Sequence, residues 1–189
     1  MDRSDIVDRI LDAAQRLCQT RGFNAFSFRD LAEQVGIRSA SIHYHFPTKN
    51  DLGQALMMRY RQHFESFRAE INRKESSPGG KLRRYVDALR EVVEDQHKLC
   101  LCSMLGAERD TLSAPVQDEI RKFVEENEAW LAKTLAERKG TNASTLPEVR
   151  AAAAGTFAAL QGAMLAARAC DDARRFDLAA DWLLTTLAV

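Results

Sequence analysis

Residues 26–52 of the chain read FSFRDLAEQVGIRSASIHYHFPTKNDL, and this stretch contains two helix starts on either side of a glycine turn. Ser27 and Asp30 fit a capping box, in which the serine hydroxyl accepts a hydrogen bond from the amide of the third helical residue and the carboxylate reaches back to the serine amide. Gly36 offers a tight turn at the end of that helix. A second short helix is expected over residues 38–45.

A further helix start follows directly. Pro47 blocks continuation of the helix before it, and Thr48 with Asp51 repeats the capping pattern. A long helix is therefore expected from here to about Arg73, and its length suggests a connector that packs at both ends of the molecule.

The remainder of the chain has the same helical period. Apolar residues recur every three or four positions, and no segment combines β-branched residues with strict alternation. One helix precedes the capped stretch and ends at Gly22, and further helices follow a break at residues 76–80. These are expected at about residues 82–93, 99–108, 115–138, 148–169 and 174–187. The sequence thus predicts an all-α protein of nine helices.

Length and charge set wide limits. The 189 residues give room for one large domain or for a small module joined to a larger one. Lys and Arg number 27, and so do Asp and Glu, so the net charge indicates neither a nucleic-acid nor a membrane partner. Residues 13–63 hold 7 basic and 3 acidic side chains, a local excess of 4 positive charges. This mild bias fits phosphate contacts in that part of the chain.

The cysteines, at positions 18, 100, 102 and 170, show no ladder of disulfide spacings, and nothing before them resembles a signal peptide. No apolar run approaches the ~20 residues of a membrane span. We expect a soluble, cytoplasmic protein with reduced thiols.

The first three helices are the most informative part. Three short helices, with a glycine turn between the second and the third, match the helix-turn-helix arrangement in which the third helix enters the major groove of DNA. Many other three-helix packings have the same lengths. Spacing alone therefore leaves DNA binding as one of several interpretations.

The residues themselves narrow the choice. Residues 23–32 (FNAFSFRDLA), 35–37 (VGI) and 41–52 (SIHYHFPTKNDL) closely resemble the signature of the tetracycline-repressor (TetR) family. The resemblance is specific over about residues 6–56, and beyond them it extends to the number and length of the helices. Arg38 stands where a small capping residue is frequent and His43 where an aromatic residue is frequent, so the operator sequence does not carry over.

The resemblance implies a nine-helix fold in two parts. These are a helix-turn-helix DNA-binding domain over residues 1–47 and an effector-binding and dimerisation domain over residues 48–189. It also implies a homodimer through helices eight and nine, a ligand pocket walled by helices four to seven, and a palindromic double-stranded DNA operator as partner. The expected function is a transcriptional regulator, a repressor released from its operator by a small-molecule or electrophile effector.

The third helix and its flanks carry two sorts of polar side chains. Those expected to reach base edges are Arg38, Ser39 and His43. Those expected to bind phosphates, which fixes register without reading sequence, are Ser41, Tyr44, His45 and Lys49. For His45 a half-buried helix-capping role is an equal alternative. Ser27 is mainly a cap, with a DNA-backbone contact as its second predicted role, while Ile42 and Phe46 are expected in the core.

Helix eight carries small residues on one face, which allow close approach of another helix. They are Ala151, Gly155, Ala158, Gly162 and Ala166. Helix nine is expected to present Leu178, Trp182 and Leu183 on one side. Together they suit a four-helix dimer interface, and the alternative is an ordinary helix pair within one chain.

Helices four to seven contribute aromatic, aliphatic and thioether side chains that are expected to enclose an effector pocket. They are Met57, Phe64, Phe67, Leu89, Met104, Phe123, Val124 and Trp130. Their composition favours an apolar or aromatic effector if they surround a cavity, and the alternative is that they fill a plain core.

His97, Cys100 and Cys102 are the one group that suggests other chemistry. Three soft ligands within six residues suit a metal, yet no fourth ligand is evident, so neither a metal nor a cofactor is predicted. The thiols are either small buried residues of a core helix or a redox or electrophile sensor. The sensor hypothesis comes from the family resemblance, since some TetR-like regulators use a cysteine at such a position, and Cys100 lies eight residues before Glu108.

Two other classes of function stand as alternatives. A small helical enzyme would need a nucleophile beside a base, and Cys100 near His97 is the only candidate pair. A protein-interaction bundle would show no DNA binding that weakens with salt. We expect a regulator rather than an enzyme.

Overall fold

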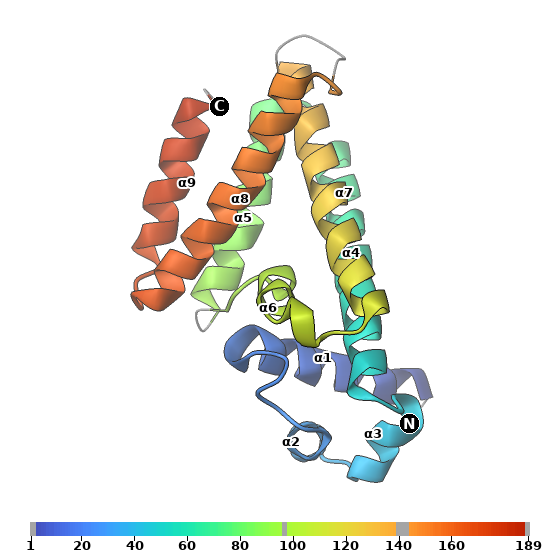
Figure 1. Cartoon of the computed structure of the whole chain (residues 1–189). Helices are drawn as coiled ribbons and strands as arrows, with labels where there is room; N and C mark the ends of the chain where they lie inside the picture. Colours follow the sequence, from blue (N-terminus) through green and yellow to red (C-terminus); the bar gives the residue numbers. More distant parts are fainter. Residues whose placement is uncertain (1–2, 96–97, 139–143, 188–189) are drawn as a thin grey trace. The chain divides into compact units, whose positions relative to one another are not determined.

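The structure is a computed structural model that describes residues 3–95, 98–138 and 144–187 (Figure 1). Within these ranges it contains nine α-helices, one 3-10 turn and no strand. The helices are α1 Arg3–Arg21, α2 Phe28–Val35, α3 Ser39–His45, α4 Lys49–Lys74, α5 Pro78–Glu94, α6 Leu101–Ala107, α7 Ala114–Arg138, α8 Pro147–Ala169 and α9 Arg174–Thr186. The all-α prediction is confirmed, and each expected helix is present close to its expected bounds.

The chain divides into two compact units. Unit 1 comprises residues 1–62 and 101–121, and unit 2 comprises residues 63–100 and 122–189. α4 and α7 therefore each contribute residues to both units. The domain boundary expected after residue 47 concerns function rather than compactness, and it stays a prediction. Across the described ranges, no helix combines the length and the apolar character needed to cross a membrane.

In unit 1 two capping boxes set where α2 and α4 begin. The Asp30 amide donates to Ser27 Oγ at 3.3 Å, and the Ser27 amide donates to Asp30 Oδ2 at 2.7 Å. The Asp51 amide donates to Thr48 Oγ1 at 3.2 Å, and the Thr48 amide donates to Asp51 Oδ2 at 2.9 Å. Between the two boxes, Gly36 ends α2 in the left-handed conformation, with a φ of 75°. Both capping predictions and the glycine turn are confirmed.

The end of α6 and the turn after it fasten the loop between α1 and α2. The Asn24 amide donates to Glu108 Oε2 at 2.8 Å, and the Asn24 side-chain amide donates to Thr111 Oγ1 at 2.8 Å. Gly22 has a φ of 102°, and a Cβ there would lie 2.5 Å from Glu108 Oε1. The turn at Gly22 matches the prediction, whereas nothing in the residue pattern indicates the 3-10 turn over Arg109–Thr111.

Unit 2 is a helical bundle in which α8 packs against α9, and α5 packs against both (Figure 1). Its interior is mostly apolar, but it encloses a small polar group. The Tyr85 ring stacks on Trp130 with 5.3 Å between ring centroids, and its hydroxyl donates to Asn127 Oδ1 at 3.0 Å. Asn127 is fully buried and donates in turn to the Phe123 carbonyl at 2.6 Å. These bonds satisfy polar atoms that would otherwise be costly to bury.

One expectation for α9 is wrong. Leu178 and Trp182 are exposed by 72% and 65%, as an outward face requires, whereas Leu183 is buried. Leu183 lies one residue beyond Trp182, which is about 100° further round the helix, so it points to a different side. Leu183 therefore belongs to the core of unit 2.

Gly53 on α4 provides a test of the packing in unit 1. A Cβ there would lie 2.9 Å from Phe23 Cζ, and the buried Phe23 ring is itself held edge-on by Phe26. We expect Gly53→Ala to lower the free energy of unfolding by about 1 kcal/mol, because overpacking outweighs the gain in helix propensity. Chemical denaturation followed by circular dichroism measures this change.

The matched control is Gly106→Ala on α6. A Cβ on Gly106 meets nothing within 4 Å, so this variant should be as stable as the wild type or slightly more stable. Equal stability of the Gly53 and Gly106 variants would contradict the close contact at Phe23.

Candidate nucleic-acid interface

α3 is a seven-residue helix that is anchored from one side. Ile42 is fully buried, and Phe46, just past the helix end, is nearly so, which confirms both as core residues. The other side is open: Arg38 and His43 are exposed, and Tyr44 is 69% exposed. The helix therefore presents its polar side chains outward from a fixed base.

An open hollow of about 480 Å³ lies where α2, α3 and α4 begin. Its wall consists of Phe26, Ser27, Phe28, Arg29, Ser39, His43, Pro47, Thr48 and Lys49. Both N-cap residues, Ser27 and Thr48, are in this wall, so two helix amino-terminal ends border one space. Such ends attract anions, because their amides lack helical partners and the helix dipole is positive there.

The hollow brings together half of the residues predicted to bind DNA. Those in its wall are Ser27, Ser39, His43 and Lys49. Those outside it are Arg38, Ser41, Tyr44 and His45. Of the second group, Ser41 and His45 are half-buried, and Arg38 and Tyr44 are exposed. Contact with DNA stays a prediction for every one of them.

Arg29 lines the hollow but is not among the residues predicted from the sequence. It is exposed in the first turn of α2. The positive end of the helix dipole disfavours a cation at such a position and favours an acidic residue. This mismatch is the feature of the sequence that draws attention to Arg29, and contact of Arg29 with an anion is a prediction.

The aromatic rings of α3 are held in place by neighbouring rings. His43 packs edge-on against Phe28, the first residue of α2, with 4.7 Å between ring centroids. Tyr44 and His45 pack edge-on against each other at 5.1 Å. Side chains that are already ordered lose less conformational entropy when a partner binds. The arrangement therefore favours recognition by α3.

Lys49 turns its ammonium group inward. Its Nζ donates a hydrogen bond to the Phe26 carbonyl, and it lies 4.5 Å and 4.9 Å from the ring centroids of Phe26 and Phe23. Partial burial lowers the pKa of Lys49 below its ordinary value, and the Glu108 carboxylate opposes this shift. Lys49 thus ties the start of α4 to the residue before the α2 cap. A phosphate contact from its remaining N–H groups stays a prediction.

The predicted effector residues are divided between the two units. Met57, which is buried, and Met104, which is half-buried, belong to unit 1. The members in unit 2 are Phe64, Phe67, Leu89, Phe123, Val124 and Trp130. The Phe64 ring packs edge-on against Phe123 at 5.0 Å and against Phe67 at 6.1 Å. An aromatic cluster therefore exists in unit 2, and its role in binding a ligand stays a prediction.

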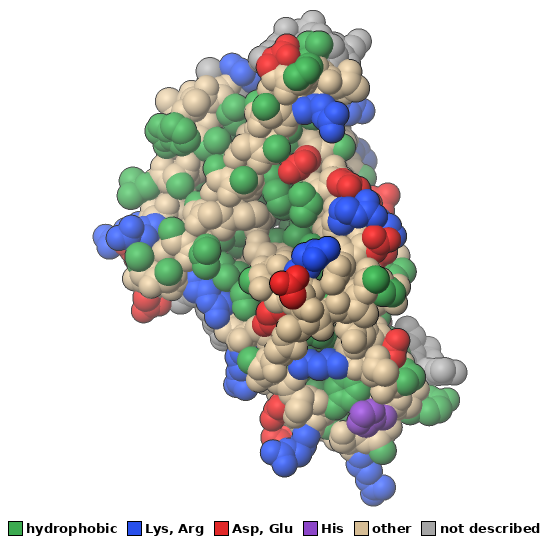
Figure 2. All heavy atoms as spheres, viewed as in Figure 1, with side chains coloured by type: hydrophobic (Ala, Val, Ile, Leu, Met, Phe, Trp, Pro, Cys, Tyr) green, Lys and Arg blue, Asp and Glu red, His purple; other side chains and the backbone are tan. Residues whose placement is uncertain are grey.

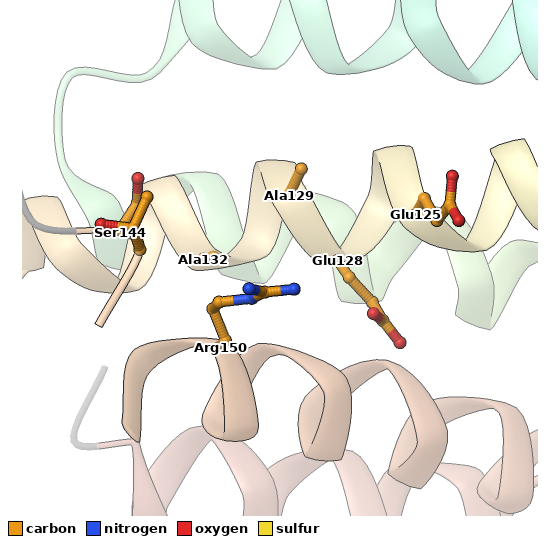
Figure 3. Close-up of a pocket in the computed structure, with 7 residues that line it drawn as sticks. Glu125, Glu128, Ala129, Ala132, Ser144 and Arg150 are labelled. Atoms are coloured by element: carbon orange, nitrogen blue, oxygen red, sulfur yellow. The ribbon is translucent and has the colours of Figure 1, made fainter. Parts of the chain in front are cut away.

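A separate cleft of about 290 Å³ lies in unit 2 between α7 and the start of α8 (Figure 3). Figure 3 shows Arg150 reaching from α8 toward α7, and Glu128 pointing from α7 toward α8. The lining residues are Glu125, Glu128, Ala129, Ala132, Ser144, Thr145 and Arg150. This charged cleft includes none of the predicted effector residues.

The cysteines differ in exposure. Cys100 is only 1% exposed and Cys102 is also buried, whereas Cys170 is exposed. Burial raises the pKa of the Cys18 thiol to about 12. His97 lies outside the described residues, and among the residues that are described no group of three His, Cys, Asp or Glu side chains could hold a metal. The sensor role of Cys100 stays a prediction.

Comparison with known proteins identifies similar chains. The model for bacterial regulatory proteins of the tetR family matches residues 10–56, the stretch that contains α2, α3 and both capping boxes. The sequence matches no curated protein.

Solved structures match over nearly the whole chain. A TetR-family transcriptional regulator from Agrobacterium tumefaciens is 33% identical, with a TM-score of 0.90 and 98% of each chain covered. A TetR transcriptional regulator from Legionella pneumophila is 29% identical, with a TM-score of 0.88 and 98% of each chain covered. The reduced form of NemR from E. coli is 18% identical, with a TM-score of 0.78 and 95% of each chain covered, and this likeness concerns the fold alone.

The α2 capping box has a consequence for the pH dependence of stability. Hydrogen bonds from the side chain and backbone of Ser27 lower the pKa of Asp30 below its ordinary value of 3.8. A carboxylate with a lowered folded-state pKa stabilises the protein above its unfolded-state pKa, and this stabilisation is lost as the pH falls through the folded-state pKa. We therefore expect Asp30→Asn to destabilise the protein at pH 7 and to destabilise it less at pH 3, because the stabilisation begins to fall once the pH is below 3.8.

Urea denaturation at both pH values measures the difference in unfolding free energy. Glu33→Gln, an exposed change on the same helix, serves as the control and should have little effect at either pH. A penalty for Asp30→Asn that is the same at both pH values would contradict the role of the ionised carboxylate.

Proposed function

Because this chain belongs to the TetR family of bacterial transcriptional regulators, we propose that it is a homodimeric, ligand-responsive repressor that binds a palindromic DNA operator. Family membership follows from the 33% identity to the Agrobacterium tumefaciens regulator over 98% of both chains. The observation that carries the DNA-binding proposal is the hollow bordered by two capped helix starts and by α3.

The helix starts are assigned to the phosphate backbone. Arg29 and Lys49 stand beside the amino-terminal ends of α2 and α4, which suit anionic oxygens. The two nearby carboxylates, Asp30 and Asp51, already accept hydrogen bonds from the cap residues. Their charge is thus directed at protein N–H groups, which reduces repulsion of a phosphate.

The exposed side of α3 is assigned to the major groove. Arg38 is exposed at the N-cap position of α3, and His43 is exposed in its last turn. The paired donors of arginine match the two acceptors on the major-groove edge of guanine, so Arg38 is the strongest candidate for reading sequence. Readout of this kind adds specificity to an affinity that phosphate contacts largely supply.

Dimerisation is assigned to the outward faces of α8 and α9. Six of the exposed positions of α8 follow the alternating spacing of four and three that a left-handed helix pair requires. They are Ala151, Gly155, Ala158, Gly162, Leu165 and Ala169. A Cβ at Gly155 or Gly162 would meet nothing within 4 Å of its own chain, so contacts within the chain do not require these glycines. A second copy packed closely against α8 would require them.

Large exposed apolar side chains lie on this face and on the neighbouring α9. Leu165, Leu178 and Trp182 are exposed by 57%, 72% and 65%. Figure 2 shows hydrophobic side chains at the surface over α8 and α9. A patch of this kind supports an interface here, and a symmetric dimer would space two copies of α3 for adjacent half-sites, ~34 Å apart on DNA.

The ligand response is assigned to unit 2, whose Phe64, Phe67 and Phe123 rings form an aromatic cluster. An effector releases the repressor if it binds better to a conformer whose two α3 helices are wrongly spaced. α4 carries residues of both units and is the proposed route of transmission. The effector is expected to be a small molecule with an apolar or aromatic part.

Two substitutions separate base reading from backbone binding. Operators are first selected from a random DNA library, and affinity is then measured by fluorescence anisotropy on selected and random duplexes. We expect Arg38→Ala to cost about 1–3 kcal/mol on the selected site only, because it removes a base contact. Lys49→Ala is expected to weaken binding to the selected and to the random duplex equally.

Salt dependence then distinguishes two roles of Lys49. If the slope of log K against log salt for Lys49→Ala is smaller in magnitude than that of the wild type by about 1, Lys49 contacts a phosphate directly. If the slope is unchanged, Lys49 acts through its hydrogen bond to the Phe26 carbonyl. Equal losses on selected and random DNA for Arg38→Ala would show that base and backbone contacts have been assigned wrongly.

A single glycine tests the dimer. Gly162→Leu places a bulky side chain on the outward face of α8 without a clash inside the chain, so the fold should persist while the dimer dissociates. Light scattering after size-exclusion chromatography measures the mass, and far-ultraviolet circular dichroism checks the fold. Gly106→Leu is the matched control, since Gly106 is an equally open glycine on α6. A Gly162→Leu variant that stays dimeric contradicts this interface.

A further inference from the structure

Arg68, in the part of α4 that belongs to unit 2, is a buried cation with an incomplete set of partners. Only 6% of the residue is exposed. Its Nη2 lies 3.4 Å from Glu126 Oε2, at the long end of the hydrogen-bond range. Its Nη1 is buried and has no hydrogen-bond partner in the part of the chain that the structure describes. The guanidinium fork is therefore only weakly engaged.

Such an arrangement is costly and requires a reason. Buried charges in proteins are normally paired or bound to a ligand, because an unpaired buried cation loses its hydration without compensation. Lys81, another buried cation of unit 2, is paired closely: its Nζ lies 2.5 Å from Glu137 Oε2. Long side chains often avoid the penalty by extending to water, but the burial of Arg68 excludes this explanation.

The surroundings of Arg68 are aromatic along the helix pair. Hydrogen bonds from Arg68 to Glu126 and from Trp130 to Asn72 join residues that are 58 apart, so α4 and α7 run parallel here. One turn before Arg68 on α4 is Phe64, whose ring contacts Phe123 at 5.0 Å. One turn after it is Asn72, which accepts the Trp130 indole N–H at 3.2 Å. Along α4, Arg68 thus lies one turn after a residue that contacts Phe123 and one turn before a residue that binds Trp130.

From this geometry we infer that Arg68 binds the carboxylate of the effector, and that the effector is a small aromatic acid. The inference rests on the proposed ligand response. An arginine fork binds a carboxylate through two parallel N–H bonds, which would use Nη1 and replace the long contact of Nη2 with Glu126. The aromatic part of the acid packs among the Phe64, Phe123 and Trp130 rings. Binding of this kind requires the side chains of Phe64 and Phe67, which are only half-buried, to rotate and make room for the ring of the acid.

Thermal unfolding of the full chain tests this inference with defined probes. Benzoate, phenylacetate and indole-3-acetate are each compared with the corresponding neutral amide. We expect at least one acid to raise Tm by about 5–10 °C at a concentration 100-fold above its Kd, and its amide to have little effect. Arg68→Met should abolish the shift, and Arg68→Lys, which keeps the charge but not the fork, should weaken it.

Two controls make the result specific. Arg83→Met removes an exposed arginine from α5 and should retain the full shift. In the absence of any acid, Arg68→Met should melt at or above the wild-type Tm, because it removes a buried charge whose ion pair with Glu126 is long and whose Nη1 has no partner among the described residues. A lower Tm for this variant would identify Arg68 as a structural residue and overturn the inference.

Other outcomes also decide it. The inference fails if no acid acts more strongly than its amide, or if the shift survives in Arg68→Met. Operator binding, measured in parallel by fluorescence anisotropy, separates this failure from that of the proposed function. If the protein binds its operator but none of the three acids, the proposed function holds and the inference fails. If it binds acids but no DNA, the acid site at Arg68 holds and the proposed function fails.

Discussion

The mutual capping of Ser27 with Asp30 and of Thr48 with Asp51 is the constraint on which the amino-terminal unit depends. Each box fixes the residue at which a helix begins, and so fixes the direction in which its first amides point. α3 is too short to be stable alone, since isolated helices of this length are marginal in water. Its position therefore follows from the capped helices on either side and from the buried Ile42.

The same caps explain how an acidic pair can border the proposed site for a phosphate. Each carboxylate is held back against the amide of its own cap residue. The remaining charge around the hollow is positive, from Arg29, Lys49 and two helix ends. Lys49 adds a mechanical element, because its bond to the Phe26 carbonyl joins the start of α4 to the approach of α2. A shift of α4 would therefore displace the start of α2 as well.

The sequence was informative wherever the determining chemistry is local. Capping boxes, the left-handed Gly36 and the helix bounds depend on residues three or four apart, and all of these predictions are confirmed. Contacts between distant residues carry no such pattern. The bond between Asn24 and Glu108 spans 84 residues, and nothing near either residue indicates it. The prediction that Leu183 lies on the same side of α9 as Trp182 was wrong, because adjacent residues on a helix do not share a face.

Two cations of α4, Lys49 and Arg68, differ in how well their charge is satisfied, and this contrast bears on regulation. Lys49, in unit 1, has a carbonyl and two rings to stabilise its charge. Arg68, in unit 2, retains an Nη1 without a partner among the described residues. A ligand can shift a conformational equilibrium only by the difference in its affinity for the two states. An unsatisfied cation supplies such a difference, because an anion that reaches it gains most in the conformer where the fork is accessible. A fully paired arginine at the same position would make the protein more stable and less responsive to an anionic ligand.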